Sequence, residues 1–171
     1  MILVSYDKSL DANAAIDRVA KLMPGAETMV LTVWEPLLDS LTRTGALGMG
    51  MAVGTYADLE DMEAASREAA LGTATEGAQR ATAAGLVAHP RCERRHGDVA
   101  NTILAVAADV DADLIVMGTR GRGGVQSFLL GSVSHAVVQH ADRAVMVAPS
   151  PPLAVRRRDR LDEQTPVPAY R

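Results

Sequence analysis

Short apolar runs alternate along this chain with longer segments in which apolar residues recur every three or four positions. Runs of the first kind are typical of buried parallel strands, and the second spacing is typical of helices with one face on a core. The runs predict strands at residues 2–6, 28–34, 86–95, 113–117 and 144–148. The segments between them predict helices at residues 9–23, 58–84, 99–109 and 132–140.

Strands that alternate with helices fold into a parallel sheet, and right-handed crossovers place helices on both of its faces. We therefore predict an α/β fold: an open five-stranded parallel sheet of order 3-2-1-4-5 with a Rossmann-like arrangement of helices. Ligands of such sheets bind beyond the carboxyl ends of the strands, where the strand order reverses. The residues after the first and fourth strands are therefore the first place to look for a site.

Two segments do not fit the alternating pattern. Residues 35–57 show no clear period and are rich in glycine, which predicts a variable loop, either a functional lid or a disordered insertion. Residues 150–171 are rich in proline and arginine, which predicts a disordered tail. The folded domain is then expected over residues 1–149.

The predicted order places the third and fifth strands at the edges of the sheet. The third strand carries Pro90 and several charged residues, which are features that protect an edge from pairing. The fifth strand, residues 144–148, has no charge and no proline. An apolar strand at an open edge favours a partner, so we expect a homodimer through this strand.

Composition narrows the class of protein further. Aromatic residues make up 3% of the chain, which argues against a β-sandwich or barrel and against a surface that stacks nucleic-acid bases. The net charge of -4 also gives no reason to expect a nucleic-acid partner. Cys92 is the single cysteine, which favours a reducing compartment. With no secretory signal and no apolar stretch of membrane-spanning length, we expect a cytoplasmic protein without a membrane partner.

A glycine-rich segment follows the fourth strand. Gly118, Gly121, Gly131 and Ser132 form the pattern Gly-x2-Gly-x9-Gly-Ser. Glycine lets a backbone approach a phosphate closely, and the N-terminus of a helix that begins at Ser132 favours an anion. The segment therefore predicts a phosphate cradle shared by a loop and a helix N-terminus.

Polar side chains of the same segment could complete that cradle. Arg120 and Arg122 offer positive charge, Ser132 and Ser134 offer hydroxyl donors, and Thr119 lies in the same loop. The alternative is that the glycines and the serine serve only the turn and the start of the helix. Other phosphate motifs are missing from the sequence: no Walker A pattern occurs, and no Gly-x-Gly-x-x-Gly follows the first strand.

The glycine-serine spacing resembles the nucleotide-binding signature of the universal stress protein family, ATP-binding subclass. Asp7-x-Ser9 after the first strand and the pair Gly97-Asp98 resemble other landmarks of that family, over residues 1–149. The resemblance implies a dimeric domain that binds ATP, together with Mg²⁺. It places Asp7 at the adenosine moiety and Val33 at the adenine. It also implies ribose and phosphate contacts from Met117, Gly118, Gly121, Gly131, Ser132 and Val133.

These observations favour an ATP-binding universal stress protein that acts as a nucleotide-dependent stress-response or signalling module. The alternatives are a slow ATPase or phosphotransferase, and a nucleotide-independent dimeric adaptor for another protein. Asp7 has a structural alternative as a helix cap or turn residue, and Val33 as a core residue. We assign no catalytic residue and no metal site formed by side chains, since His135 and His140 do not share a helix face.

Overall fold

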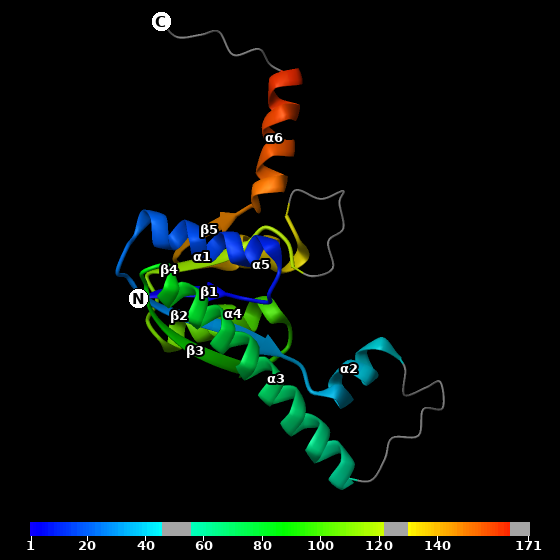
Figure 1. Ribbon diagram of the computed structural model, residues 1–171. Helices are drawn as coiled ribbons and strands as arrows, with labels where there is room; N and C mark the ends of the chain where they lie inside the picture. Colours follow the sequence, from blue (N-terminus) through cyan, green and yellow to red (C-terminus); the bar gives the residue numbers. More distant parts are fainter. Residues whose placement is uncertain (46–55, 122–129, 165–171) are drawn as a thin grey trace, which may run out of the picture.

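The computed structural model describes residues 1–45, 56–121 and 130–164. Its sheet consists of β1 (Ile2–Ser5), β2 (Glu27–Trp34), β3 (Val87–Arg94), β4 (Leu114–Gly118) and β5 (Ala144–Ala148). The strands are all parallel and lie in the order β3-β2-β1-β4-β5, which confirms the predicted topology (Figure 1). β1 is central: Leu3 is in register with Met29 of β2 on one side and with Ile115 of β4 on the other.

Helices cover both faces of the sheet and create two cores. α1 (Leu10–Leu22) and α3 (Tyr56–Ala83) pack on the face that buries Ile2 and Val4. α4 (Val99–Asp109) and α5 (Ser132–His140) pack on the opposite face, which buries Leu3. Successive side chains of a strand point to opposite faces, and here both faces are covered by helices. Ile2, Leu3 and Val4 of β1 are therefore all apolar.

A stripe of alanines explains how the chain builds a close-packed core with few aromatic side chains. Ala70, Ala74, Ala78 and Ala81 are buried along one face of α3. Gly77 lies on the same face, and a Cβ added there would come within 2.6 Å of the Tyr6 ring. Short side chains thus let α3 lie close to β2 and β3. The N-terminal part of α3 extends past the sheet (Figure 1).

The prediction of a loop without secondary structure over residues 35–57 is wrong in part. Residues Leu37–Thr44 form a helix, α2, and α3 begins at Tyr56. α2 ends at Gly45, which has a φ of 72°, and its Arg43 donates two hydrogen bonds to Glu35. The same Glu35 accepts a bond of 2.6 Å from Arg95 after β3. Residues 46–55 of the expected loop lie outside the described residues.

The prediction of a disordered tail over residues 150–171 is also wrong in part. Residues Pro151–Gln164 form a helix, α6, that projects away from the sheet (Figure 1). Proline is well tolerated in the first helical turn, where its missing N–H has no intrahelical partner. The N–H groups of Leu153 and Ala154 donate to the Ser150 carbonyl, and Leu153 is only 7% exposed. Residues 165–171 are outside the described part of the chain.

Within the described residues, none of the helices combines the length and the apolar character that crossing a bilayer requires.

Candidate functional site

A pocket of about 740 Å³ opens at the carboxyl ends of β1, β2 and β4, where the strand order reverses. Most of the predicted site residues line it together: Asp7, Val33, Met117, Gly118, Arg120, Gly121, Gly131, Ser132, Val133 and Ser134. The sequence analysis missed further lining residues, namely Ser5, Tyr6, Ser9, Ala12, Val99, Leu130 and His135. Arg122, also predicted, lies outside the described residues. Pockets at this position of an open parallel sheet are the usual ligand sites of such folds.

The glycines of the motif permit close approaches that a side chain would block. A Cβ on Gly121 would lie 2.7 Å from Oδ2 of Asp7, so the two loops that flank the pocket nearly touch there. A Cβ on Gly118 would lie 2.7 Å from both the carbonyl carbon and Cβ of Asp11 in α1. Gly131 is less crowded, with the nearest atom, the Thr119 carbonyl oxygen, at 3.3 Å. All three glycines thus lie beside the cavity, and Gly118 also permits the close packing of α1.

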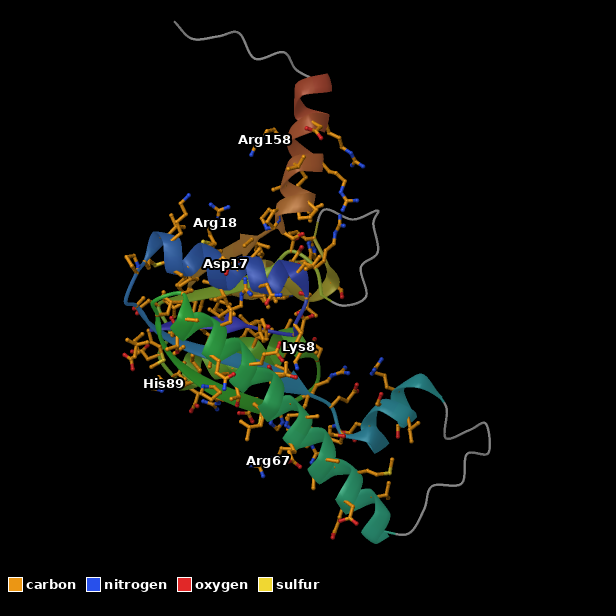
Figure 2. All side chains as sticks on the ribbon, in the orientation of Figure 1. Lys8, Asp17, Arg18, Arg67, His89 and Arg158 are labelled. Carbon is orange, nitrogen blue, oxygen red and sulfur yellow. The ribbon has the colours of Figure 1, made fainter. Side chains whose placement is uncertain are left out.

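Asp7 lines the pocket and also stabilises the turn between β1 and α1. Its Oδ1 accepts a hydrogen bond of 3.0 Å from the Ser9 backbone N–H, while Oδ2 faces Gly121. Lys8 between them has a φ of 66°, in the left-handed region, and its Nζ lies 2.5 Å from Glu76 of α3 (Figure 2). The turn therefore holds the Asp7 carboxylate at the mouth of the cavity, and the structural and binding interpretations of Asp7 are compatible.

The N-terminus of α5 forms the opposite wall. Gly131 precedes the helix with extended backbone, and no side chain caps the first turn by a hydrogen bond. Ser132 is exposed and lines the pocket, whereas Ser134 is buried. The Ser134 hydroxyl lies 2.9 Å from the Thr119 carbonyl and 3.0 Å from that of Gly131. It therefore fastens the helix to the loop, while the first-turn N–H groups, which have no partner within the helix, belong to residues that line the cavity.

Thr119 differs from the other predicted site residues because its side chain points away from the pocket. It is 1% exposed and is not among the lining residues. Its hydroxyl donates to the buried carboxylate of Asp11 in α1, a residue that the sequence analysis did not identify. Thr119 thus supports the loop from behind instead of contacting a ligand.

Most of the surface of the pocket is apolar. Val33, Val99, Met117, Leu130 and Val133 contribute its aliphatic surface. Tyr6 also lines the pocket, but its ring packs against Gly77 of α3. The Tyr6 hydroxyl donates to Asn13 at 3.0 Å, and burial raises its pKa. Val33 lines the pocket and also packs against the core between the sheet and α4, so a core role and a binding role are compatible for this residue.

The charged groups at the mouth do not form a metal site of their own. Among the described residues, no three His, Cys, Asp or Glu side chains gather closely enough to hold an ion. A Mg²⁺ ion in this pocket would therefore depend mainly on oxygen ligands from a bound phosphate compound, which is a common arrangement for this cation.

This combination of an open parallel sheet, a pocket at its switch point and a helix N-terminus in the wall defines a doubly wound α/β protein. Residues 1–149 match the profile of the universal stress protein family. The chain is 35% identical over 148 residues to a universal stress protein of Thermus aquaticus, which covers 85% of this chain and 96% of that protein. The chain therefore belongs to the universal stress protein family, which confirms the family, as distinct from the subclass, that its motifs resemble.

Solved structures share this fold at low sequence identity. The hypothetical protein MJ0577 matches with a TM-score of 0.65 and 20% identity, over 86% of this chain and 94% of that one. A universal stress protein in complex with cAMP matches with a TM-score of 0.58 and 23% identity, over 87% and 96%. A family member from Arabidopsis thaliana with AMP bound gives 0.56 and 16%, over 86% and 90%. At these identities, the likeness establishes the fold alone.

Proposed function

We propose that this chain binds ATP in the pocket between the β1–α1 turn and the β4–α5 connection, and acts as a nucleotide-dependent module of a stress response. One observation carries the proposal: a pocket of about 740 Å³ lies at the switch point, and its lining combines aliphatic side chains with glycines and a helix N-terminus. An adenine nucleotide has the same division into a flat base and an anionic phosphate chain.

The polar mouth suits the phosphates. Gly121 and Gly131 leave the backbone uncovered there, and the start of α5 presents N–H groups and the positive end of the helix dipole. Arg120 adds positive charge to the lining. Mg²⁺ would accompany the nucleotide through the phosphate oxygens, with Asp7 as the nearest carboxylate of the lining.

The apolar interior suits the adenosine part. Val33 and Val99 offer aliphatic surface for a base, and Asp7 can accept hydrogen bonds from ribose hydroxyls. Relatives of the same fold with cAMP and AMP support an adenine nucleotide as the ligand class. Aliphatic walls discriminate weakly between bases, so the phosphate contacts should provide much of the affinity.

The free edge of the sheet supports the predicted homodimer. β5 pairs with β4 on one side, and its outer edge carries the uncharged residues Ala144–Ala148. Pairing of this edge with a second copy would cover its unpaired backbone groups. Measurement of the molar mass in solution tests this part of the proposal, and a Lys substitution at Met146 should shift the protein toward the monomer.

Thermal unfolding with and without ligand tests the binding proposal. At a ligand concentration of about one hundred times Kd, binding stabilises the native state by about 2.7 kcal/mol. For a chain of this length, that corresponds to a rise in Tm of about 5 to 10 °C. We expect ATP with Mg²⁺ to produce such a rise, and calorimetric titration to show one site per chain.

Two valine variants provide a matched comparison. Gly121→Val directs a branched side chain at the Asp7 carboxylate and should abolish the ligand-induced shift. Gly72→Val makes the same chemical change on an open helix surface, where no atom lies within 4 Å of an added Cβ, and should keep it. The proposal is wrong if ATP, AMP and cAMP all leave the wild-type Tm unchanged. If Gly121→Val binds as the wild type does, the ligand site lies elsewhere.

A further inference from the structure

A buried carboxylate joins the nucleotide pocket to the C-terminal helix. Asp11 lies in the first turn of α1 and is 6% exposed. Its Oδ2 accepts a hydrogen bond from the Thr119 hydroxyl in the loop after β4. Its Oδ1 accepts a bond of 3.0 Å from the backbone N–H of Ser150, the residue before α6. One side chain therefore connects three segments that are far apart in the sequence.

These bonds compensate for the burial of a charge. Burial by itself raises the pKa of Asp11, but the hydrogen bonds from Ser150, Thr119 and the Arg120 backbone outweigh it, and the pKa lies below its ordinary value. A carboxylate with such donors is ionised at neutral pH and accepts strong, directional hydrogen bonds. Gly118 permits the arrangement, since a Cβ there would collide with the Asp11 backbone.

Thr119 is held on every side by the same network. Its N–H donates to the Ala148 carbonyl at 3.1 Å, and its own carbonyl accepts from the Gly131 N–H at 2.7 Å. Ser134 also reaches that carbonyl, and Asp11 holds the side chain. The neighbours of Thr119 on both sides, Gly118 and Arg120, line the pocket. Any rotation of Thr119 would therefore move the pocket wall.

We infer that Asp11 is a positioning residue: it fixes the nucleotide-binding loop through Thr119 and couples occupancy of the pocket to the start of α6 through Ser150. The inference rests on the proposed nucleotide binding. The coupling is reciprocal, because a ligand that stabilises one arrangement of the loop must also stabilise the arrangement of α6 that shares the carboxylate. α6 projects from the body and carries exposed arginines such as Arg158 (Figure 2). Because its start is held by the Ser150–Asp11 bond, α6 is the element that should become more ordered when the pocket binds nucleotide.

Calorimetric titration with ATP and Mg²⁺, well below the melting temperature, tests the positioning role. Asp11→Asn and Thr119→Val each remove a charge-assisted hydrogen bond behind the loop, and each should weaken binding about tenfold or more. The double variant should lose less than the sum of the two single losses, since both changes act on the hydrogen bond between Thr119 and Asp11. Asp17→Asn is the matched control, because Asp17 lies on α1 too but is exposed and paired with Arg80.

The results separate this inference from the proposed function. If the wild type itself does not bind ATP, the proposed function fails. If the wild type binds and both variants bind equally well while melting at lower temperature, Asp11 is only a structural residue and the inference fails. If Asp11→Asn does not fold, Thr119→Val decides alone, because it keeps the carboxylate and its bond to Ser150.

Hydrogen exchange tests the coupling to α6. The amides of Leu153 and Ala154 donate to the Ser150 carbonyl and report on the first turn of the helix. ATP should slow their exchange in the wild type and in Asp17→Asn, and the effect should be lost in Asp11→Asn. Unchanged exchange of these two amides in the ATP-saturated wild type would overturn the coupling.

Discussion

Gly118 offers a direct test of the packing between α1 and the pocket loop. In Gly118→Ala, the new methyl group would lie 2.7 Å from the carbonyl carbon of Asp11 and 2.8 Å from the backbone nitrogen of Ala12. These are helix backbone atoms, so relief requires α1 to move away from β4. Overpacking of this kind costs about 1 to 3 kcal/mol. For a chain of this length, we expect Tm to fall by about 2 to 12 °C.

Gly72→Ala makes the same substitution where an added Cβ meets no atom within 4 Å. Since Gly72 lies inside α3, alanine should stabilise the protein by about 0.5 to 1 kcal/mol. Urea unfolding followed by circular dichroism, without nucleotide, measures both free energies. The reasoning is refuted if Gly118→Ala is as stable as the wild type, or if the two variants change stability in the same direction.

Two further predictions concern the connections beside the pocket. Lys8 has a φ of 66°, which disfavours a branched side chain. Lys8→Val should therefore lower the free energy of unfolding by about 1 to 2 kcal/mol. Lys8→Gly should change it by less than about 1 kcal/mol, although the exposed ion pair with Glu76 is lost. Equal urea midpoints for the two variants would contradict this prediction. The hydrogen bond from Arg43 and the charge of Arg95 lower the pKa of Glu35 below its ordinary value of 4.5. The ionised Glu35 therefore stabilises the folded protein above pH 4.5, and this stabilisation is lost as the pH falls through the lowered pKa. The difference in urea midpoint between the wild type and Glu35→Gln should therefore shrink from pH 6 to pH 3. A difference that stays constant would show that the charge of Glu35 is not what stabilises the protein.

The sheet and the pocket could be predicted because their signals are local. Five apolar runs separated by helical periods define the strands, and the glycine spacing after the fourth run marks the close approaches at Gly118 and Gly121. The orientation of a side chain is not local in this way. Thr119 stands inside the motif, yet its hydroxyl faces Asp11, whose role depends on a backbone group 139 residues away.

The two missed helices have a common cause. α2 and α6 lie in segments where proline, glycine or clustered charge obscures the helical period. Their stability depends on tertiary contacts, such as Glu35 with Arg43 and Arg95, or the burial of Leu153. Such contacts appear only once the strands are placed beside one another. The family profile ends at residue 149, so α6 lies beyond the part of the chain that the family defines.

The length of α3 has a consequence for how this protein can vary. Its 28 residues span about 42 Å, whereas the eight residues of β3 beneath it span about 26 Å. Among residues 59–83 of this helix, the buried positions begin at Ala70, so much of its first half overhangs the sheet. Whole turns could be inserted or deleted in that overhang without moving the alanine stripe or the pocket. We expect homologues to differ in length at the N-terminal end of α3. New contacts with other molecules could evolve there without a change in the geometry of the pocket.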